Sequence, residues 1–212
     1  MRQLERGWNA FDLTIYTDGS AFDGNATGGG GVIVTTGHPS DPQIHRSFAI
    51  PTGKWCSSFQ SELKATKKAL QEVLTEEGVS RVRIVSDSLS TLQKIKAAHP
   101  SLPTKTEDEC EILILLLNLS DNGCQITFAW RPRHCGIPGN DLADEKAKAG
   151  TEWDQSTAHH HYDAVKAAIH RALKPPPFKH ERVKKIYGNH GDEASSAADS
   201  SLTRQQQGKL FY

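Results

Sequence analysis

Four acidic residues stand at positions where their side chains could meet. Asp18 and Asp87 each follow a strand-like segment. Glu62 lies in the first turns of a long helical pattern, and Asp144 lies in the last helical pattern. Carboxylates that gather at a sheet edge repel one another and are costly to desolvate unless cations compensate. All-oxygen ligands favour Mg²⁺ or Mn²⁺ over zinc, and two such ions about 4 Å apart can activate a water molecule and stabilise a leaving oxygen.

Each acid taken singly has an ordinary structural explanation. Asp18 begins the sequence Asp-Gly-Ser, which is common in turns. Glu62 and Asp144 could be solvated charges on helix surfaces. The metal-binding hypothesis therefore depends on the ordered set and on the elements that would bring its members together.

Residues 12–150 alternate between strand-like and helix-like segments. The expected strands are Leu13–Thr17, Gly28–Thr36, Ile44–Ile50, Arg81–Ser86 and Gln125–Trp130. The expected helices run from Ser57 or Ser58 to about Glu77 and then over Ser88–Ala98, Glu107–Ser120 and Pro138–Gly150. Runs joined by short turns favour antiparallel pairing, and strands joined through helices favour parallel pairing. The order predicts an α/β fold with a five-stranded mixed sheet, three antiparallel strands then two parallel, and helices on both faces.

Charge and cysteine content limit the partners that the chain can have. Residues 1–150 hold 16 Lys and Arg against 18 Asp and Glu, a net charge of −2. A slightly acidic domain that handles nucleic acid needs metal cations or a local basic patch. The four cysteines include no Cys-x-x-Cys pair, which favours free thiols over a zinc site.

The ends of the chain differ in composition from its middle. Residues 1–11 form an N-terminal extension without an apolar core, and no apolar run is long enough for a membrane span. We therefore expect an intracellular protein, nuclear or cytoplasmic, that is not secreted. Residues 12–150 form the predicted domain, and residues 151–212 form a mostly disordered tail with one helix over 156–173.

Four motifs follow one another within residues 12–150. They are Thr17-Asp18-Gly19-Ser20, Gln60-Ser61-Glu62-Leu63, Ser86-Asp87-Ser88 and the segment HCGIPGNDLAD from His134 to Asp144. In this order, and on these elements, they resemble the ribonuclease H family. The resemblance implies a ribonuclease H-like fold and two Mg²⁺ ions, replaceable by Mn²⁺, bound by Asp18, Glu62, Asp87 and Asp144. It also implies a catalytic role for His134 beside the scissile phosphate, in proton transfer or product release.

The same resemblance implies contacts with a nucleic-acid substrate. The residues concerned are Gly19, Ser20, Asn25, Ser57, Ser58, Ser88 and Asn140. Asn25 and the run Gly28–Gly31 would bring the backbone close to RNA 2′-hydroxyl groups, although the glycines also fit a flexible hairpin entry. Ser58-Phe59 stands where many members have two asparagines, and Ala98–Lys105 is too short for their basic insertion. The candidates to replace that insertion are Lys64, Lys67, Lys68, Arg131 and Arg133, unless the lysines form only a solvated helix face.

The resemblance predicts a metal-dependent endonuclease that hydrolyses the RNA strand of RNA–DNA hybrids and acts as a monomer. Two segments and the missing insertion resemble the ribonuclease H region of non-LTR retrotransposon polyproteins. The segments have the sequences SSFQSEL and HCGIPGNDLADEKAKAG. That likeness implies a reverse transcriptase domain in a parent polyprotein. The alternative is a non-catalytic remnant or hybrid-binding module of the same fold. An integrase or Holliday-junction nuclease is disfavoured by the motif order.

Overall fold

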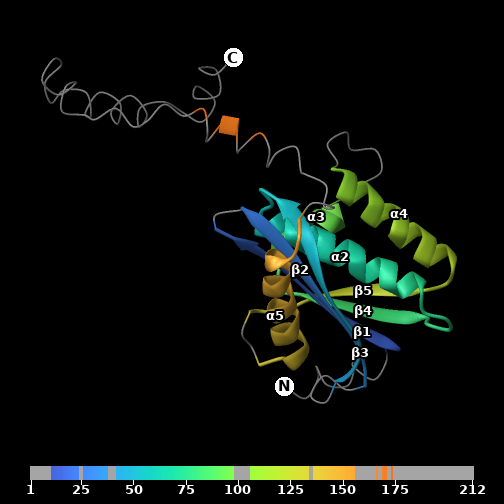
Figure 1. Cartoon of the computed structure of the whole chain (residues 1–212). Helices are drawn as coiled ribbons and strands as arrows, with labels where there is room; N and C mark the ends of the chain where they lie inside the picture. The colour runs from blue at the N-terminus through green and yellow to red at the C-terminus, as the bar shows by residue number, and fades with distance from the viewer. Residues whose placement is uncertain are drawn as a thin grey trace, which may run out of the picture. The chain divides into compact units, whose positions relative to one another are not determined.

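Five strands form a single sheet in the computed structural model, which describes residues 11–23, 26–37, 42–97, 106–133, 136–155, 166, 169, 170 and 173. The strands are β1 (Leu13–Phe22), β2 (Thr27–Thr36), β3 (Gln43–Lys54), β4 (Arg81–Ser86) and β5 (Gln125–Trp130). They lie in the order β3-β2-β1-β4-β5 (Figure 1). Strands β3, β2 and β1 pair antiparallel, whereas β4 pairs parallel with both β1 and β5. The predicted α/β class and mixed sheet are confirmed.

Strand β1 is longer than the sequence predicts, and this changes the place of the first motif. The antiparallel pairing with β2 continues to Phe22, opposite Thr27. The parallel pairing with β4 stops earlier, at Thr17 opposite Ser86. Asp18 therefore lies inside a strand, at the point where its parallel neighbour ends. The expectation that the strand stops at Thr17 in an Asp-Gly-Ser turn is wrong.

Helices cover both faces of this sheet. Helices α2 (Ser58–Leu74), α3 (Leu89–Ala97) and α4 (Glu107–Asp121) lie on one face, and α5 (Pro138–Glu152) lies on the other (Figure 1). Helix α2 begins at a capping box in which the Ser57 hydroxyl accepts from the Gln60 N–H and the Gln60 side chain accepts from the Ser57 N–H. It ends at Leu74, before the expected Glu77. None of the helices among the described residues is long and apolar enough to cross a membrane.

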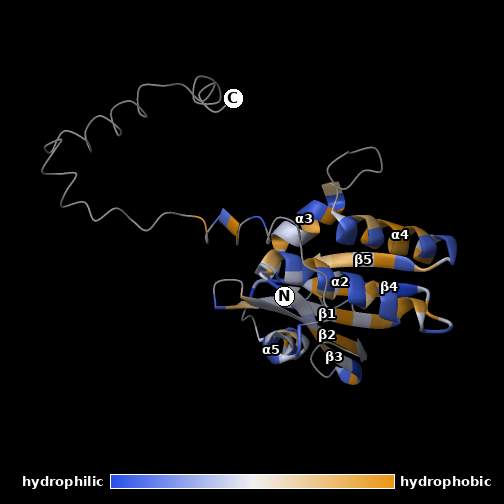
Figure 2. Cartoon of the chain, turned by 45° about the horizontal axis from the view of Figure 1, so that its top comes forward, coloured by the Kyte–Doolittle hydropathy of each residue, from blue (hydrophilic) through white to orange (hydrophobic). Residues whose placement is uncertain are grey.

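Two apolar clusters pack against the sheet, one on each face. The larger lies under α2 and α4 and includes Ile15, Val32, Leu70, Ile84 and Ile112. The smaller lies under α5 and consists of Tyr16, Ile33, Val85 and Ala143. Figure 2 shows the apolar stretch of β5 beside α4, whose surface mixes apolar and hydrophilic residues. Because Ile15 and Tyr16 are consecutive, their opposite clusters follow from the alternation of side chains along a strand.

The glycines of β2 allow α5 to pack directly on the sheet. A Cβ atom on Gly29 would lie 2.1 Å from the backbone oxygen of Ala147, and one on Gly31 would lie 1.9 Å from that of Ala143. Backbone atoms of α5 thus occupy the space that any other side chain would need. The run Gly28–Gly31 lies inside β2, within the strand expected over Gly28–Thr36, and two of its glycines approach a helix rather than a ligand.

We expect Gly31→Ala to lower the free energy of unfolding by about 1–3 kcal/mol, because α5 must move to admit the methyl group. Gly30→Ala is the matched control in the same strand, since its Cβ would meet the flexible Ile50 side chain, at 2.9 Å. Urea unfolding of both variants beside the parent chain measures the difference. Equal losses of stability in the two variants would contradict this packing account.

Packing continues beyond Gly150, where the sequence places the end of the domain. Helix α5 runs to Glu152, and the side chain of Gln155 is buried. Its Oε1 accepts from the Gly53 N–H at 2.8 Å, and its Nε2 donates to the Gly150 carbonyl at 3.0 Å. The boundary at 150 stays a prediction, but the contacts of the domain extend at least to Gln155.

The tail is described at only a few positions. The chain divides into two units, residues 1–168 and 169–212. Of the helix expected over 156–173, the described residues 166, 169, 170 and 173 are helical and exposed. Residues 1–10 and the rest of the tail lie outside the described residues.

Candidate metal centre

Strand register and one glycine bring three of the four acids together. The parallel pairing of β1 with β4 ends just before Asp18 and Asp87, so these two residues lie side by side where β4 ends and β1 continues. Glu62 reaches them from α2. A Cβ atom on Gly19 would lie 2.3 Å from the backbone nitrogen of Glu62, so the absence of a side chain there lets the helix approach the strand.

The three carboxylates form a compact and buried group. Each offers an oxygen that lies within 4.8 Å of the others. Asp18 is 0% exposed and Glu62 is 4% exposed, while the side chain of Asp87 is 6% exposed. Asp18 Oδ1 accepts from the Gly19 N–H at 2.8 Å, but its Oδ2 is buried with no hydrogen-bond partner among the described residues. An unpartnered buried oxygen in an all-carboxylate set fits a hard divalent cation such as Mg²⁺.

The electrostatics of the group favour protons or cations. Burial raises the pKa of Asp18 to about 6, and the nearby charge of Asp87 reinforces this rise. Burial also raises the pKa of Glu62 well above its usual value, with the charge of Asp18 adding to the effect. Carboxyl groups this close cannot all ionise without a compensating positive charge. A bound divalent cation would supply that charge and keep the acids ionised.

Asp144 lies at the rim of the group, on α5. Its side chain is 23% exposed and accepts from Lys148 Nζ at 2.5 Å, one helical turn along. Burial alone would raise its pKa, but the hydrogen bond from Lys148 and the proximity of Asp18 lower it overall. Asp144 is therefore the neighbour of Asp18 and stands outside the compact three-acid group.

Arg133 joins the acids from the segment after β5. Its Nε donates to Asp87 Oδ2 at 2.9 Å, and its terminal nitrogen lies 3.4 Å from Asp18 Oδ1. The sequence presents Arg133 only as a candidate for phosphate contact. The signal that could have placed it is the parallel order of β4 and β5, which sets the residues after Trp130 beside those after Ser86.

Two further residues at the site were missed by sequence reasoning. The Trp130 indole Nε1 donates to the backbone oxygen of Asp87 at 3.0 Å. The Ser86 hydroxyl donates to Glu62 Oε2 at 3.5 Å. Both residues stand in motifs or strands that were recognised, but their side-chain directions depend on the packing of neighbouring elements.

The substrate residues implied by the resemblance fall in different places. Gly19 and Ser20 lie in β1, and Ser88 follows Asp87 at the start of α3. Ser57 caps α2, and the exposed Ser58 is its first residue. Asn140 is 3% exposed within α5, with its Oδ1 unpartnered among the described residues. Asn25 and His134 lie outside the described residues, and their roles stay predictions.

The lysines of α2 are engaged within the protein. Lys67 pairs with Asp108 at 2.5 Å and with Glu111 at 2.9 Å, both on α4. Lys68 pairs with Glu72 at 2.6 Å and lies over the Phe48 ring. Lys64 Nζ donates to the Thr52 carbonyl oxygen at 2.7 Å. These contacts argue that the three lysines serve the packing of α2 more than they serve a substrate.

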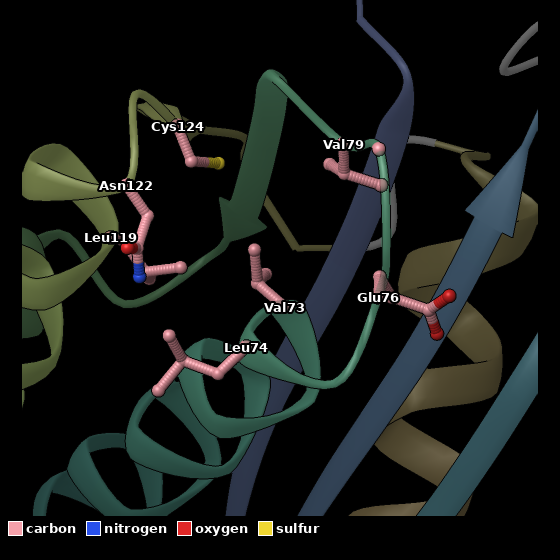
Figure 3. A pocket seen from close by; sticks show the side chains of 8 residues that line it. Val73, Leu74, Glu76, Val79, Leu119, Asn122 and Cys124 are labelled. Atoms are coloured by element: carbon pink, nitrogen blue, oxygen red, sulfur yellow. The ribbon is translucent and has the colours of Figure 1, made fainter.

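A separate pocket of about 250 Å³ lies between the end of α2, the end of α4 and the residues that precede β4 and β5 (Figure 3). Val73, Val79, Leu119 and Cys124 are among its lining residues, and none of the four acids lines it. The cysteines that the structure describes, Cys56, Cys110 and Cys124, are free, and the candidate metal group found among the described residues contains carboxylates alone.

Comparison with known proteins agrees with this architecture. A family model described as RNase H matches residues 11–152. The N-terminal RNase H domain of rv2228c from Mycobacterium tuberculosis, solved as a fusion with maltose binding protein, is 16% identical and has a TM-score of 0.52, with 74% of this chain and 99% of that chain covered. LC11-RNase H1, isolated from compost by a metagenomic approach, is 21% identical, with a TM-score of 0.53 and coverage of 66% and 96%. The protease–reverse transcriptase of prototype foamy virus is 23% identical, with a TM-score of 0.54 and coverage of 69% of this chain and 22% of that chain.

The fold and the site together define an α/β domain with an acidic site suited to divalent metal ions. The structural likenesses, all under 25% identity, show the fold. The family model covers well over half of the chain, and the chain therefore belongs to the RNase H family.

We expect the metal-free protein to be more stable near pH 5 than near pH 7, by on the order of 1–3 kcal/mol. The pKa of Asp18 is about 6 in the folded chain against 3.8 ordinarily, so the folded state binds more protons between those values. Stability is therefore lost as the pH rises through that window, and the raised pKa of Glu62 acts in the same direction. Thermal unfolding in EDTA across pH 5–7 measures the slope. The same slope in Glu62→Gln would show that the acid group does not cause it.

Proposed function

We propose that this chain is a metal-dependent ribonuclease that hydrolyses the RNA strand of RNA–DNA hybrids. The observation that carries the proposal is the buried three-carboxylate group in a chain of the RNase H family, with oxygens within 4.8 Å of one another. The all-oxygen donor set supports Mg²⁺, with Mn²⁺ as a substitute.

The acids are assigned to two metal ions. Asp18, Glu62 and Asp87 would hold them from the floor of the site, and Asp144 would complete the set from the rim. Two bound ions supply an activated water molecule and stabilise the charge on the leaving 3′-oxygen. Asp144 would contribute a carboxylate whose Oδ2 pairs with Lys148 in the metal-free protein.

Other residues are assigned to the substrate and to proton transfer. His134 would move a proton at the scissile phosphate or assist product release, since the usual pKa of a histidine lies near neutrality. Ser57 and Ser58 lie at the N-terminus of α2, where the helix dipole favours a phosphate. Gly19, Ser20, Asn25, Ser88 and Asn140 complete the proposed contact set.

We propose that the domain by itself binds RNA–DNA hybrid weakly. The domain has a net charge of −2 over residues 1–150, and the α2 lysines are committed to contacts within the protein. Each missing phosphate contact reduces counterion release. A reverse transcriptase in the same polyprotein would offset this weakness by holding the hybrid at high local concentration, and the motif spelling supports such a retrotransposon origin.

We expect Asp18→Asn to lower the rate of hybrid cleavage in Mg²⁺ on the order of 10³-fold or more, because it removes a metal-binding charge from the floor of the site. Folding should be retained or strengthened, since a buried carboxylate is removed from a repulsive group. Gel cleavage of hybrid, duplex RNA and duplex DNA, with Mg²⁺ or EDTA, measures activity and specificity.

Asp141→Asn is the matched control, because it makes the same charge change at an exposed position on α5, close to Asp144. Full hybrid cleavage by Asp18→Asn would overturn the assignment of Asp18. Binding of hybrid by the parent chain without any cleavage would favour the non-catalytic alternative.

A further inference from the structure

The guanidinium of Arg133 lies beside the acid group, where its positive charge compensates the charges of the carboxylates. It reaches two of the three carboxylates at once, Asp87 at 2.9 Å and Asp18 at 3.4 Å. Both acids are almost fully buried, whereas the Arg133 side chain is 55% exposed. A positive charge thus approaches the buried acids from the solvent side, where it can leave without disturbing the core.

The segment that carries Arg133 is held close to the acids by the backbone. The Arg131 N–H donates to the Ser86 carbonyl oxygen at 3.0 Å, which extends the β4–β5 pairing one residue past the end of β5. The Trp130 indole donates to the Asp87 carbonyl oxygen. Since these contacts involve backbone groups of β4 and Asp87, they keep Arg133 within reach whether or not its own ion pairs are formed.

Arg133 and a divalent cation would use the same oxygens. Asp18 Oδ1 and Asp87 Oδ2 accept from the guanidinium, and both carboxylates belong to the group that could hold a metal. A cation that binds between these acids must displace the guanidinium, because like charges at that distance repel and each oxygen has few free lone pairs.

We propose that Arg133 is a built-in counter-ion of the metal site, which neutralises the acids in the metal-free protein and is displaced when a divalent ion binds. The inference rests on the proposed function, because it concerns regulation of the same site. Arg133 thereby stabilises the metal-free fold. It also weakens the apparent metal affinity, because the site can bind a metal ion only during the fraction of time in which Arg133 does not occupy it. The chain consequently requires a higher metal concentration to fill its site than the acids alone would set.

The two effects have one origin and must be equal in size. By the thermodynamic cycle, the free energy that Arg133 adds to the metal-free protein is the free energy that the metal must overcome. Ion pairs with one exposed partner are weak, so removal of Arg133 should tighten metal binding by roughly three- to tenfold. A fivefold change corresponds to about 1 kcal/mol of lost stability in the metal-free protein.

The test uses the full chain and Mn²⁺ alone, with no nucleic acid. Calorimetric titration measures Mn²⁺ affinity, and urea unfolding in EDTA measures metal-free stability, for the parent, Arg133→Gln, Arg133→Lys and Arg131→Gln. Arg131→Gln is the matched control, because it removes the same charge two residues away and leaves both Arg133 ion pairs in place. Arg133→Lys keeps a charge but loses the two-pronged geometry, so its affinity should fall between parent and Arg133→Gln.

We expect Arg133→Gln to bind Mn²⁺ more tightly and to lose a matching amount of metal-free stability, while Arg131→Gln changes neither by as much. Lost stability with unchanged Mn²⁺ affinity would make Arg133 an ordinary structural ion pair and overturn the inference. Equal Mn²⁺ binding by all four proteins would overturn the inference and leave the proposed function standing. No Mn²⁺ binding by any of them would overturn both.

Discussion

The carboxyl groups of Asp18, Glu62 and Asp87 lie within 4.8 Å of one another, where little water can screen their repulsion. A folded chain can tolerate such a group by keeping protons on it, by pairing it with an internal cation or by binding a metal ion. The raised pKa of Asp18 and Glu62 reflects the first route, and the Arg133 ion pairs provide the second. The third keeps the acids ionised at neutral pH and also supplies the ions that metal-dependent hydrolysis requires.

The same close backbone contacts that build the fold also place the acids. Gly19 lets α2 approach β1, and α2 carries Glu62. Gly31, which pairs with Asp18 across the sheet, lets α5 approach β2 next to Asp144. A side chain at either glycine would move a helix together with its acid. Stability and site geometry are therefore coupled at these two positions, through rigid elements rather than through loops.

Much of this arrangement could be predicted from the sequence. The bounds of β4 and β5 and the approximate helices followed from periodicity and turn residues, because those signals are local. The acids were recognisable because their motifs occur in order. The full length of β1 was not predictable, since residues after Thr17 stay in the strand only through pairing with β2.

The sequence did not predict which partners the basic side chains contact. Arg133 and Lys67 are both basic residues that the sequence offers as candidates for substrate contact. In the structure, Arg133 contacts the acids, whereas Lys67 pairs with α4. Composition cannot separate these outcomes, because they depend on how distant elements pack. Likewise, the glycines of β2 indicate that another group packs closely on the strand. The sequence does not say whether that group is a ligand or helix α5.

The central claim is that these acids form a metal centre, and crystals of the chain grown with Mn²⁺ would test it most directly. Anomalous scattering locates manganese without reference to activity or to nucleic acid. We predict an anomalous peak from a manganese ion that is bound by oxygens of Asp18 and of at least one of Glu62 and Asp87. In the same crystals, Arg133 should have moved away from Asp18. A fully occupied manganese elsewhere, or none while the Arg133 ion pairs persist at saturating Mn²⁺, would contradict the account.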